Sequence, residues 1–422
     1  MITAFSAFAD REWWHRAWVV QEAIIPEKAL LVCGSDSLPW STIEQASLNW
    51  RKHAKTCCAE LLRHYPPNQN WAIRHVIAEV KKIARLREER ARGIAVSLPI
   101  ILSEFRARGA TDPRDKIFAF IDLMKQQDSG STGAQIVANY NLELLQVYEQ
   151  AISSIIASTN SLEILISTNL NRQGSAWPSW VPDWSVPVEN SQLSTLNLRR
   201  SLCYSASGSE QAQATVRPNS ILSASAIFID KAFKIGNFIK ETKDWGQLLA
   251  VFKEWEQICG LPDHGHEPYP TGGTVLDAHW RTILGNLTSM AQTEQMGVQY
   301  RKAVDADFDS YKTWWAETKE KGSGVIDHIG DIILGTFVTK TLFVTLGGLF
   351  GIGPMGMRED DEIYVFLGSN VPFVLRPLKP DGDGVDCSEL CYRLVGDCYL
   401  HGFMEGSALN LHIYKRQTVN LR

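Results

Sequence analysis

"REDDEIYVFLGSNVPFVLRPL", residues 358–378, contains two short apolar runs separated by Gly-Ser-Asn. This pattern predicts a β-hairpin, because glycine and asparagine accept the turn conformations that join two strands. A second hairpin is predicted at 341–353, "TLFVTLGGLFGIG", and a fifth strand within 391–403, "CYRLVGDCYLHGF". Five short strands with turn residues between them favour a small antiparallel β-barrel or curled sheet within residues 331–422. Residues 403–409 are expected to close one end as a helical turn.

The whole chain has the composition of a globular protein with more than one core. It contains 422 residues, of which 45% are hydrophobic and 21% charged, and its formal net charge is −5. Two or three packed units are therefore expected. The negative charge argues against nucleic-acid binding by the protein as a whole, since neutralising phosphates requires a basic face.

The ends and the cysteines indicate a cytoplasmic chain. Residues 1–14 have no basic segment followed by a long apolar stretch, so no signal peptide is predicted. The apolar segment 332–353 carries Lys340 together with glycines and β-branched residues, which suit paired strands better than a membrane helix. We therefore expect a soluble protein whose cysteines are reduced thiols. These are Cys33, Cys57, Cys58, Cys203, Cys259, Cys387, Cys391 and Cys398.

Helical patterns dominate the first half of the chain. Residues 41–66 are expected to form one helix, and a second amphipathic helix is predicted from Trp71 onward. The second helix ends in a cluster of lysines and arginines between Lys81 and Arg92. We interpret this cluster as a solvated helix face, with binding to nucleic acid or a membrane surface as the alternative.

The stretch "TDPRDKIFAFIDLM", 111–124, predicts the start of a helix. Asp112 suits the N-cap, Pro113 the first helical position, and Asp115 the first turn, where acidic groups complement the helix dipole. We interpret Asp112, Arg114 and Asp115 as structural residues, with a catalytic role as the alternative.

Three tryptophans stand close together in "REWWHRAWVVQEAIIPEKALLVCG", 11–34. The spacing of Trp14, Trp18 and Glu22 is i, i+4, i+8, which places all three on roughly one face of a helix. A short strand is expected to follow. A carboxylate beside two indoles is either an interfacial residue or part of a site.

Two later stretches carry side chains that could bind a ligand or a metal. The prolines of "AWPSWVPDWS", 176–185, predict a stiff extended strap that packs over helices, with an aromatic ligand platform as the alternative. Cys259, His264 and His266 have metal-binding side chains, but their spacing matches no common zinc site, so no metal site is predicted. His401 is expected to be packed or hydrogen-bonded.

Four of these stretches, taken together and in order, resemble the fungal heterokaryon-incompatibility (HET domain) family. They are "RAWVVQEAIIPEKALLVCG", "TDPRDKIFAFIDLM", "WPSWVPDWS" and the region from "GIGPMGMREDDEIYVFLGSN" to "YRLVGDCYLHGFMEGSAL". The family's opening strand and its Trp-Ile-Asp…Cys-Ile-Asn-Gln segment have no counterpart here. The resemblance therefore implies a HET domain that is N-terminally truncated.

The resemblance also implies a fold and a division into domains. We expect an α+β protein: a mainly helical body with a remnant of a TIR-like α/β HET domain, and a small C-terminal antiparallel barrel-like unit. Residues 1–45 would be the remnant, 46–186 a helical region with the DPRDK and WPSWVPDW motifs, 187–330 a variable mixed or helical region, and 331–422 the β unit.

HET domains are in turn similar to TIR domains, some of which cleave NAD. The resemblance assigns Glu22 to catalysis and Trp18 to the nucleotide site, because Trp18, Val19 and Glu22 match the TIR Trp-Val-x-x-Glu pattern. A carboxylate there would stabilise the oxocarbenium character that develops when an N-glycosidic bond breaks. NAD would be a substrate rather than a cofactor, and no cofactor is expected.

Two functions follow as hypotheses. The first is a protein of fungal self/non-self recognition, linked to programmed cell death, that is catalytically silent and acts as an interaction scaffold for a protein partner. The second is an NAD glycohydrolase, acting through Glu22, that is active only if the missing N-terminal elements complete its pocket. For the fold, we also expect the face of the first helix that carries Trp14 and Trp18 to be left partly exposed, because the strands that it should meet are missing.

Overall fold

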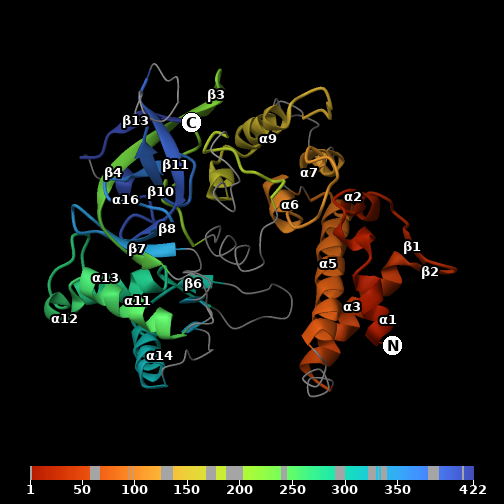
Figure 1. The fold of residues 1–422 in the computed structure, drawn as a ribbon, viewed down its shortest axis with the longest axis horizontal. Helices are drawn as coiled ribbons and strands as arrows, with labels where there is room; N and C mark the ends of the chain where they lie inside the picture. Colours follow the sequence, from red (N-terminus) through yellow and green to blue (C-terminus); the bar gives the residue numbers. More distant parts are fainter. Residues whose placement is uncertain are drawn as a thin grey trace. The chain divides into compact units, whose positions relative to one another are not determined.

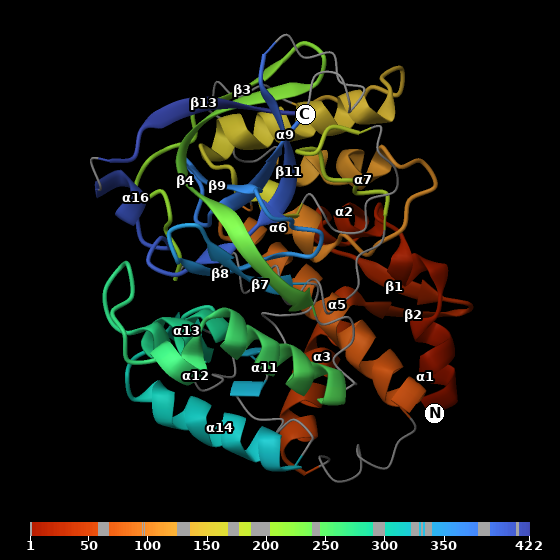
Figure 2. The ribbon, with the colours of Figure 1, turned by 60° about the vertical axis from the view of Figure 1, so that its left-hand side comes forward.

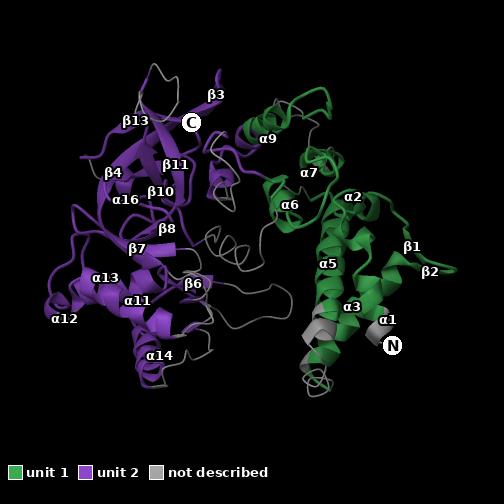
Figure 3. Cartoon of the chain, in the orientation of Figure 1, with its two compact units in different colours: residues 1–154, 184–187 green, residues 155–183, 188–422 purple. Residues whose placement is uncertain are grey.

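The computed structural model of the chain separates into two compact units (Figures 1 and 3). Unit 1 comprises residues 1–154 and 184–187, and unit 2 comprises residues 155–183 and 188–422. The structure describes residues 2–57, 67–94, 96, 98–124, 136–167, 177–186, 203–238, 245–289, 300–321, 329–330, 332–333, 340–378, 389–410 and 413–422.

Unit 1 is mainly helical, as expected. Its described elements are α1 (Ile2–Ala9), the 3₁₀ turn η1 (Glu12–His15), α2 (Val19–Ile24), β1 (Leu30–Cys33), β2 (Asp36–Pro39), α3 (Trp40–Lys55), α5 (Pro67–Ala91), α6 (Leu98–Glu104), α7 (Asp115–Phe118), α8 (Ile121–Met124) and the first part of α9 (Leu144–Thr159). The far end of the helix predicted over 41–66 lies outside the described residues.

The prediction of one helix through Trp14, Trp18 and Glu22 is wrong. The chain leaves η1 at His15 and pairs with Gly109: the Ala17 N–H donates to the Gly109 carbonyl at 2.8 Å, and the Gly109 N–H donates to the His15 carbonyl. This bridge uses backbone groups that a continuous helix would need for itself. Helix α2 therefore begins afresh at Val19.

The strand expected after this helix forms one half of a hairpin. Strand β1 pairs with β2 in an antiparallel register that joins Cys33 to Asp36 and Leu30 to Pro39. The turn between them starts at Gly34, whose φ of 65° is left-handed and favours glycine. Leu31 is buried, whereas Leu30 and Val32 face solvent. Figure 1 shows the hairpin extending away from the helices of unit 1.

Much of the basic end of α5 is occupied by contacts within unit 1. The Arg87 guanidinium donates to the carbonyls of Ala23, Pro26 and Glu27, which lie at and just beyond the C-terminal end of α2. A cation there complements the negative end of the helix dipole. Other charges form ion pairs: Lys82–Glu79, Arg85–Glu89, Arg85–Glu104 and Arg92–Glu88. Several cations of this cluster thus have structural roles.

A buried ion pair stands beside the N-terminal bridge. Glu79 of α5 accepts from Arg108 at 2.7 Å, and both side chains are less than one tenth exposed. Burial would raise the pKa of Glu79, but Lys82 and Arg108 outweigh burial and lower it. Arg108 also donates to the Arg16 carbonyl at 3.4 Å. The pair therefore supports the backbone where it departs from helical geometry.

The DPRDK charges have structural partners in the folded chain. Asp112 accepts from the Arg114 N–H at 2.9 Å, but α7 begins only at Asp115 and its N-cap is Arg114, so the predicted N-cap at Asp112 is wrong. The predicted helix is also split into α7 and α8. The Arg114 side chain binds Asp112 and the carbonyls of Tyr140 and Leu142. Asp115 accepts from the Tyr140 hydroxyl at 2.6 Å, and this bond raises the pKa of Tyr140 to about 12. These contacts tie two distant loops together.

Unit 2 contains the second part of α9, a β-rich body and a helical layer. Its other described elements are η2 (Glu163–Ser167), β3 (Ala214–Arg217), β4 (Ile221–Phe238), α11 (Trp245–Ile258), α12 (Leu261–His264), α13 (Val275–Ile283), β5 (Leu287–Ser289), β6 (Tyr300–Lys302), α14 (Asp307–Lys321), β7 (Lys340–Thr345), β8 (Phe350–Pro354), β9 (Glu362–Phe366), β10 (Phe373–Pro377), β11 (Cys391–Asp397), β12 (Tyr399–Leu400), α16 (Ser407–Asn410) and β13 (Arg416–Leu421).

Both predicted hairpins are confirmed, as β7–β8 and β9–β10. Five strands close into a ring in the order β4, β13, β11, β10, β9 and back to β4. The α+β class and the barrel unit are thus confirmed. The expectation of a wholly antiparallel barrel is wrong, because β11 and β13 run parallel. Closure leaves no free edge in the ring.

Strand β4 is shared between the barrel and a second sheet (Figure 2). Its N-terminal half pairs with β13 and β9, and its C-terminal end pairs with β7, which continues to β8 and β12. Helix α11 packs on its far end, where a Cβ on Gly236 would stand only 2.5 Å from the Trp255 ring. The Trp255 indole donates to the Asn237 carbonyl at 3.0 Å. The barrel thus takes one strand from the region predicted to be variable.

The tryptophan-proline segment packs against strands rather than helices in its first half. Trp180 is fully buried, and its indole donates to the Ser220 carbonyl at 3.0 Å beside β4. The Ser179 hydroxyl accepts from the Leu394 N–H of β11 at 2.7 Å and donates to the Arg422 carbonyl. Trp180 and Ser179 are therefore part of the barrel packing.

Two further expectations concern the cysteines and the membrane. Cys391 takes part in a disulfide, so the expectation of reduced thiols does not hold for this residue; its partner is not among the described residues. Lys340 is buried, and its ammonium lies 3.6 Å from a carboxylate oxygen of Asp397. Within the described ranges, no helix is both long and apolar enough to span a membrane.

Candidate functional site

A dense polar network within the described part of unit 2 is built on α13. Thr274 caps this helix, because its hydroxyl accepts from the Asp277 N–H at 3.1 Å. Asp277 lies in the first turn, where a carboxylate complements the helix dipole, and accepts from the Trp280 indole at 3.0 Å. Arg281, one turn later, lies 4.4 Å from the Trp280 ring centroid and stacks on the indole as a cation–π pair.

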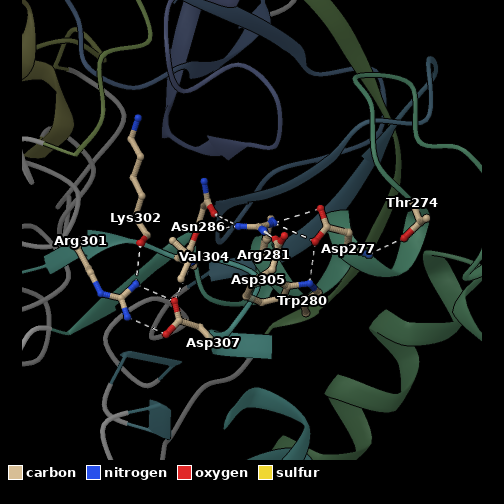
Figure 4. A network of polar contacts seen from close by, with 11 residues as sticks. Thr274, Asp277, Trp280, Arg281, Asn286, Arg301, Lys302, Val304, Asp305 and Asp307 are labelled. Atoms are coloured by element: carbon tan, nitrogen blue, oxygen red, sulfur yellow. Dashed lines mark hydrogen bonds and ion pairs between the residues drawn. The ribbon is translucent and has the colours of Figure 1, made fainter. Parts of the chain in front are cut away.

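Arg281 is the centre of the network (Figure 4). Its Nε donates to both carboxylate oxygens of Asp277 at 3.0 and 3.1 Å. One terminal nitrogen donates to the Ala303 carbonyl at 2.7 Å and to Asn286 at 3.2 Å, and the other donates to Asp305. All three guanidinium nitrogens are thus engaged. Arg281 therefore fixes the segment after β6 against α13.

A second ion pair holds the other side of this segment. Arg301 of β6 donates through two nitrogens to the two carboxylate oxygens of Asp307, each at 2.8 Å. Asp307, in the first turn of α14, also accepts from the Val304 N–H at 2.8 Å. The bidentate geometry fixes direction as well as distance. The turn between β6 and α14 is therefore held from both sides.

A histidine and two tyrosines lie near the same network. The Nδ1 of His401 lies 2.9 Å from the Tyr399 hydroxyl, and its ring packs against Tyr269. The Tyr269 hydroxyl accepts from the Phe350 N–H at 2.6 Å. Burial lowers the pKa of His401 to about 4, with Asp277 opposing this shift and Arg281 adding to it. His401 is therefore neutral at physiological pH and hydrogen-bonded, as the sequence predicted.

The polar groups of this cluster hold one another in fixed positions. The guanidinium nitrogens of Arg281 already donate to acceptors within the protein, so the side chain is not available to bind an anion in a bidentate way. The Asp305 side chain, by contrast, is 96% exposed and stands at the rim of the network. The arrangement displays a fixed surface turn, and its interior groups satisfy one another.

The sequence-predicted site residues lie in unit 1, and the structure places them differently. Trp18 immediately precedes α2 and is half-buried, while Trp14 is buried within η1. Glu22 is exposed on α2, and within the described residues its carboxylate forms no ion pair. The backbone bridge at Gly109 separates Trp14 from α2, so a single helical face does not carry all three side chains.

The network around α13 was missed from the sequence, although a signal was present. In "TVLDAHWR", 274–281, a threonine stands three residues before an aspartate, and an arginine follows at i+4 from that aspartate. This is a helix start followed by an ion pair on one helix face. The contacts of Arg281 with Ala303 and Asp305 cross more than twenty residues, and no local pattern reveals them.

The side chains of Cys259, His264 and His266 do not form a metal site in the described structure. Cys259 is buried, which raises the pKa of its thiol. His264 is exposed and lies 2.7 Å from Glu267. In the described part of the chain, no group of three or more candidate ligands comes together.

Comparison with known proteins finds a family match within unit 2. Residues 263–417 match the Het-6 β-barrel domain family, and this span includes the α13 network and most of the barrel strands. This part of the chain is therefore similar to the Het-6 β-barrel domain of fungal heterokaryon-incompatibility proteins.

A curated relative is similar to the chain over nearly its whole length. The chain is 20% identical to heterokaryon incompatibility protein 6, OR allele, of Neurospora crassa, in an alignment that covers 96% of its residues. The chain spans 65% of the length of that relative. No solved structure matches it.

Proposed function

We propose that the chain acts in fungal self/non-self recognition as a catalytically silent scaffold that binds a protein partner. The proposal is carried by the α13 network, in which the chemically capable side chains bind one another and hold a surface turn in place. Preorganised surface of this kind favours recognition, because little conformational entropy is lost on binding.

The barrel supports the same role. A closed ring of strands gives loops and turns a fixed base, and recognition residues in many folds lie on such loops. Asp305, with its exposed carboxylate, stands on the turn between β6 and α14 of the same unit, outside the ring. We infer that a partner would contact this face through complementary positive charge.

NAD cleavage through Glu22 is the alternative proposal, carried by the sequence resemblance alone. It requires further groups beside Glu22, because an oxocarbenium-like transition state is stabilised in a water-excluded pocket. Glu22 is exposed on α2 as the chain stands. Activity would therefore appear only with another chain that covers this helix.

A cell-fusion experiment tests the scaffold. Strains expressing the chain, Glu22→Gln or Glu27→Gln are paired with a tester strain, and the survival of fused cells is measured. Glu27 is a matched control because it is also an exposed glutamate in unit 1. We expect all three forms to change survival equally, since a scaffold does not need the Glu22 carboxylate. No change with any form, compared with the empty strain, would refute the proposed function.

The same proteins, purified, are incubated with NAD and the released nicotinamide is measured. The scaffold predicts no release. Release that is lost in Glu22→Gln and kept in Glu27→Gln, together with loss of the cellular effect in Glu22→Gln, would replace the scaffold by the enzyme.

A further inference from the structure

Strand β1 has one edge that pairs with β2 and one that does not. Residues Ala29, Leu31 and Cys33 face β2: Ala29 accepts from the Trp40 N–H at 2.9 Å, and the register pairs Leu31 with Leu38. Because strand backbones alternate in direction, the N–H and C=O groups of Leu30 and Val32 point to the opposite side. Within the described residues, neither residue has a backbone partner there.

The side chains of the same two residues are also unprotected. Leu30 is 69% exposed and Val32 is 68% exposed. The strand "LLVC" contains no charge and no proline, the devices by which edge strands avoid pairing with other chains. The edge strand β3 of unit 2 differs, because it ends in Arg217 followed by Pro218. Strand β1 therefore has the features of an edge that accepts another strand.

We propose that a second copy of this chain is that partner, and that the two β1 strands pair antiparallel about a two-fold axis. Because Leu30 and Val32 both present outward backbone groups, the fitting register places Leu30 of one copy opposite Val32 of the other. Each apolar side chain then gains a cross-strand neighbour on the same face of the sheet. The two hairpins together form a four-stranded sheet.

Charge at the two ends of the strand favours a second copy over an unrelated strand. Lys28 precedes β1 and Asp36 follows the turn after it; both are exposed, and neither has an ion-pair partner within the described residues. In the proposed register, Lys28 of one copy comes beside Gly34 and the turn that leads to Asp36 of the other. The pairing thus brings a positive charge of one copy near a negative charge of the other.

The dimer is expected to be weak. Two four-residue strands bury less than the roughly 1,200 Å² of a stable interface, so a dissociation constant of about 10–100 µM is expected. The inference rests on unit 1 alone. It holds whether or not the chain acts as a recognition scaffold.

Sedimentation equilibrium over a wide range of protein concentrations tests the proposal. Wild type should self-associate, and Val32→Arg should weaken the association by about tenfold or more, because a charge is placed on the pairing edge. Leu48→Arg is the matched control: Leu48 is 57% exposed, on α3 of the same unit. It should associate like wild type. A monomeric wild type at about 1 mM, or equal loss in both variants, overturns the proposal.

Cross-linking tests the register and does not depend on Val32→Arg. In a Cys33→Ser, Cys57→Ser background, the double variant Leu30→Cys, Val32→Cys should form a covalent dimer on mild oxidation, since the proposed register places each new thiol opposite one. Leu48→Cys in the same background should remain monomeric. Equal cross-linking of the two, or none in the double variant, contradicts the pairing.

Discussion

The β1–β2 hairpin is antiparallel and the barrel of unit 2 is mostly so, but their edges have opposite fates. In the barrel, the strands pair in a closed ring in the order β4, β13, β11, β10 and β9, so every strand of the ring has two neighbours. In the hairpin, β1 has one neighbour and exposes alternate apolar residues. Closure converts sheet edges into core, whereas an open edge keeps its backbone groups available for a partner.

The largest expected effect lies on β4, the strand that the barrel shares with the second sheet. Trp255→Ala removes a fully buried ring that packs against β4, and should lower the free energy of unfolding of unit 2 by about 3–5 kcal/mol. Urea unfolding followed by circular dichroism measures this change. Trp255→Phe, which keeps a ring but loses the indole N–H, should cost less; an equal loss would contradict packing as the main cause.

Removing the buried ion pair of unit 1 should come next. Glu79→Gln leaves the Arg108 charge buried without its counter-ion and should cost about 3 kcal/mol. Urea unfolding of unit 1 at neutral pH is the measurement. Glu88→Gln is the control, since Glu88 forms an exposed ion pair on the same helix. Similar losses in both variants would show that burial of the pair does not matter.

The same pair predicts a pH dependence with a defined sign. The pKa of Glu79 in the folded chain lies below its ordinary value of 4.5, because Lys82 and Arg108 outweigh burial. Its contribution to stability is therefore complete above about pH 5 and is lost as the pH falls through the folded pKa. Wild type should lose more stability than Glu79→Gln between pH 5 and pH 3. Parallel curves would exclude this assignment.

A smaller effect is expected at the helix cap beneath the polar network. Thr274→Ala removes the hydroxyl that accepts from the Asp277 N–H and should cost about 1 kcal/mol. Thr274→Ser retains the acceptor and should remain close to wild type in the same thermal unfolding experiment. If serine fails to restore stability, packing of the threonine methyl group rather than capping would explain the loss.

The smallest effect sharpens the contrast between open and closed edges. Leu30→Ala should change the free energy of unfolding by less than about 0.5 kcal/mol, because the side chain is already in solvent. Leu375→Ala, at a fully buried position of β10, should cost about 2–5 kcal/mol. Both are compared by urea unfolding at low protein concentration, where self-association is absent. Similar losses would remove the distinction.

Local turn chemistry made part of this fold predictable. The Leu-Gly-Gly turn before Leu349 and the Gly-Ser-Asn turn at 368–370 revealed the β7–β8 and β9–β10 hairpins, since left-handed residues and short loops specify such turns directly. A helix start near Asp112 was also predictable, although α7 begins only at Asp115. Signals that act over a few residues survive in a single sequence.

Long-range contacts decided the rest. Strand β4 was not predicted, because its buried residues alternate in some places and stand in consecutive runs in others. Shifts of register near Asp230, Lys234 and Phe238 also interrupt the two-residue period of a strand. The break between η1 and α2 depends on Gly109, far along the chain. Likewise, the partners of Arg281 beyond α13 come from a different segment. None of these contacts leaves a local pattern.

The strand shared by the two sheets has a practical consequence for cutting the protein into pieces. The family match begins at residue 263, whereas β4 occupies Ile221–Phe238 and closes the ring. A fragment expressed from the start of the match would lack β4 and would leave one edge of β9 and one edge of β13 unpaired. Such a fragment should aggregate, whereas a fragment that begins before β3 retains every strand of the barrel. The evolutionary boundary and the physical boundary of this domain therefore do not coincide.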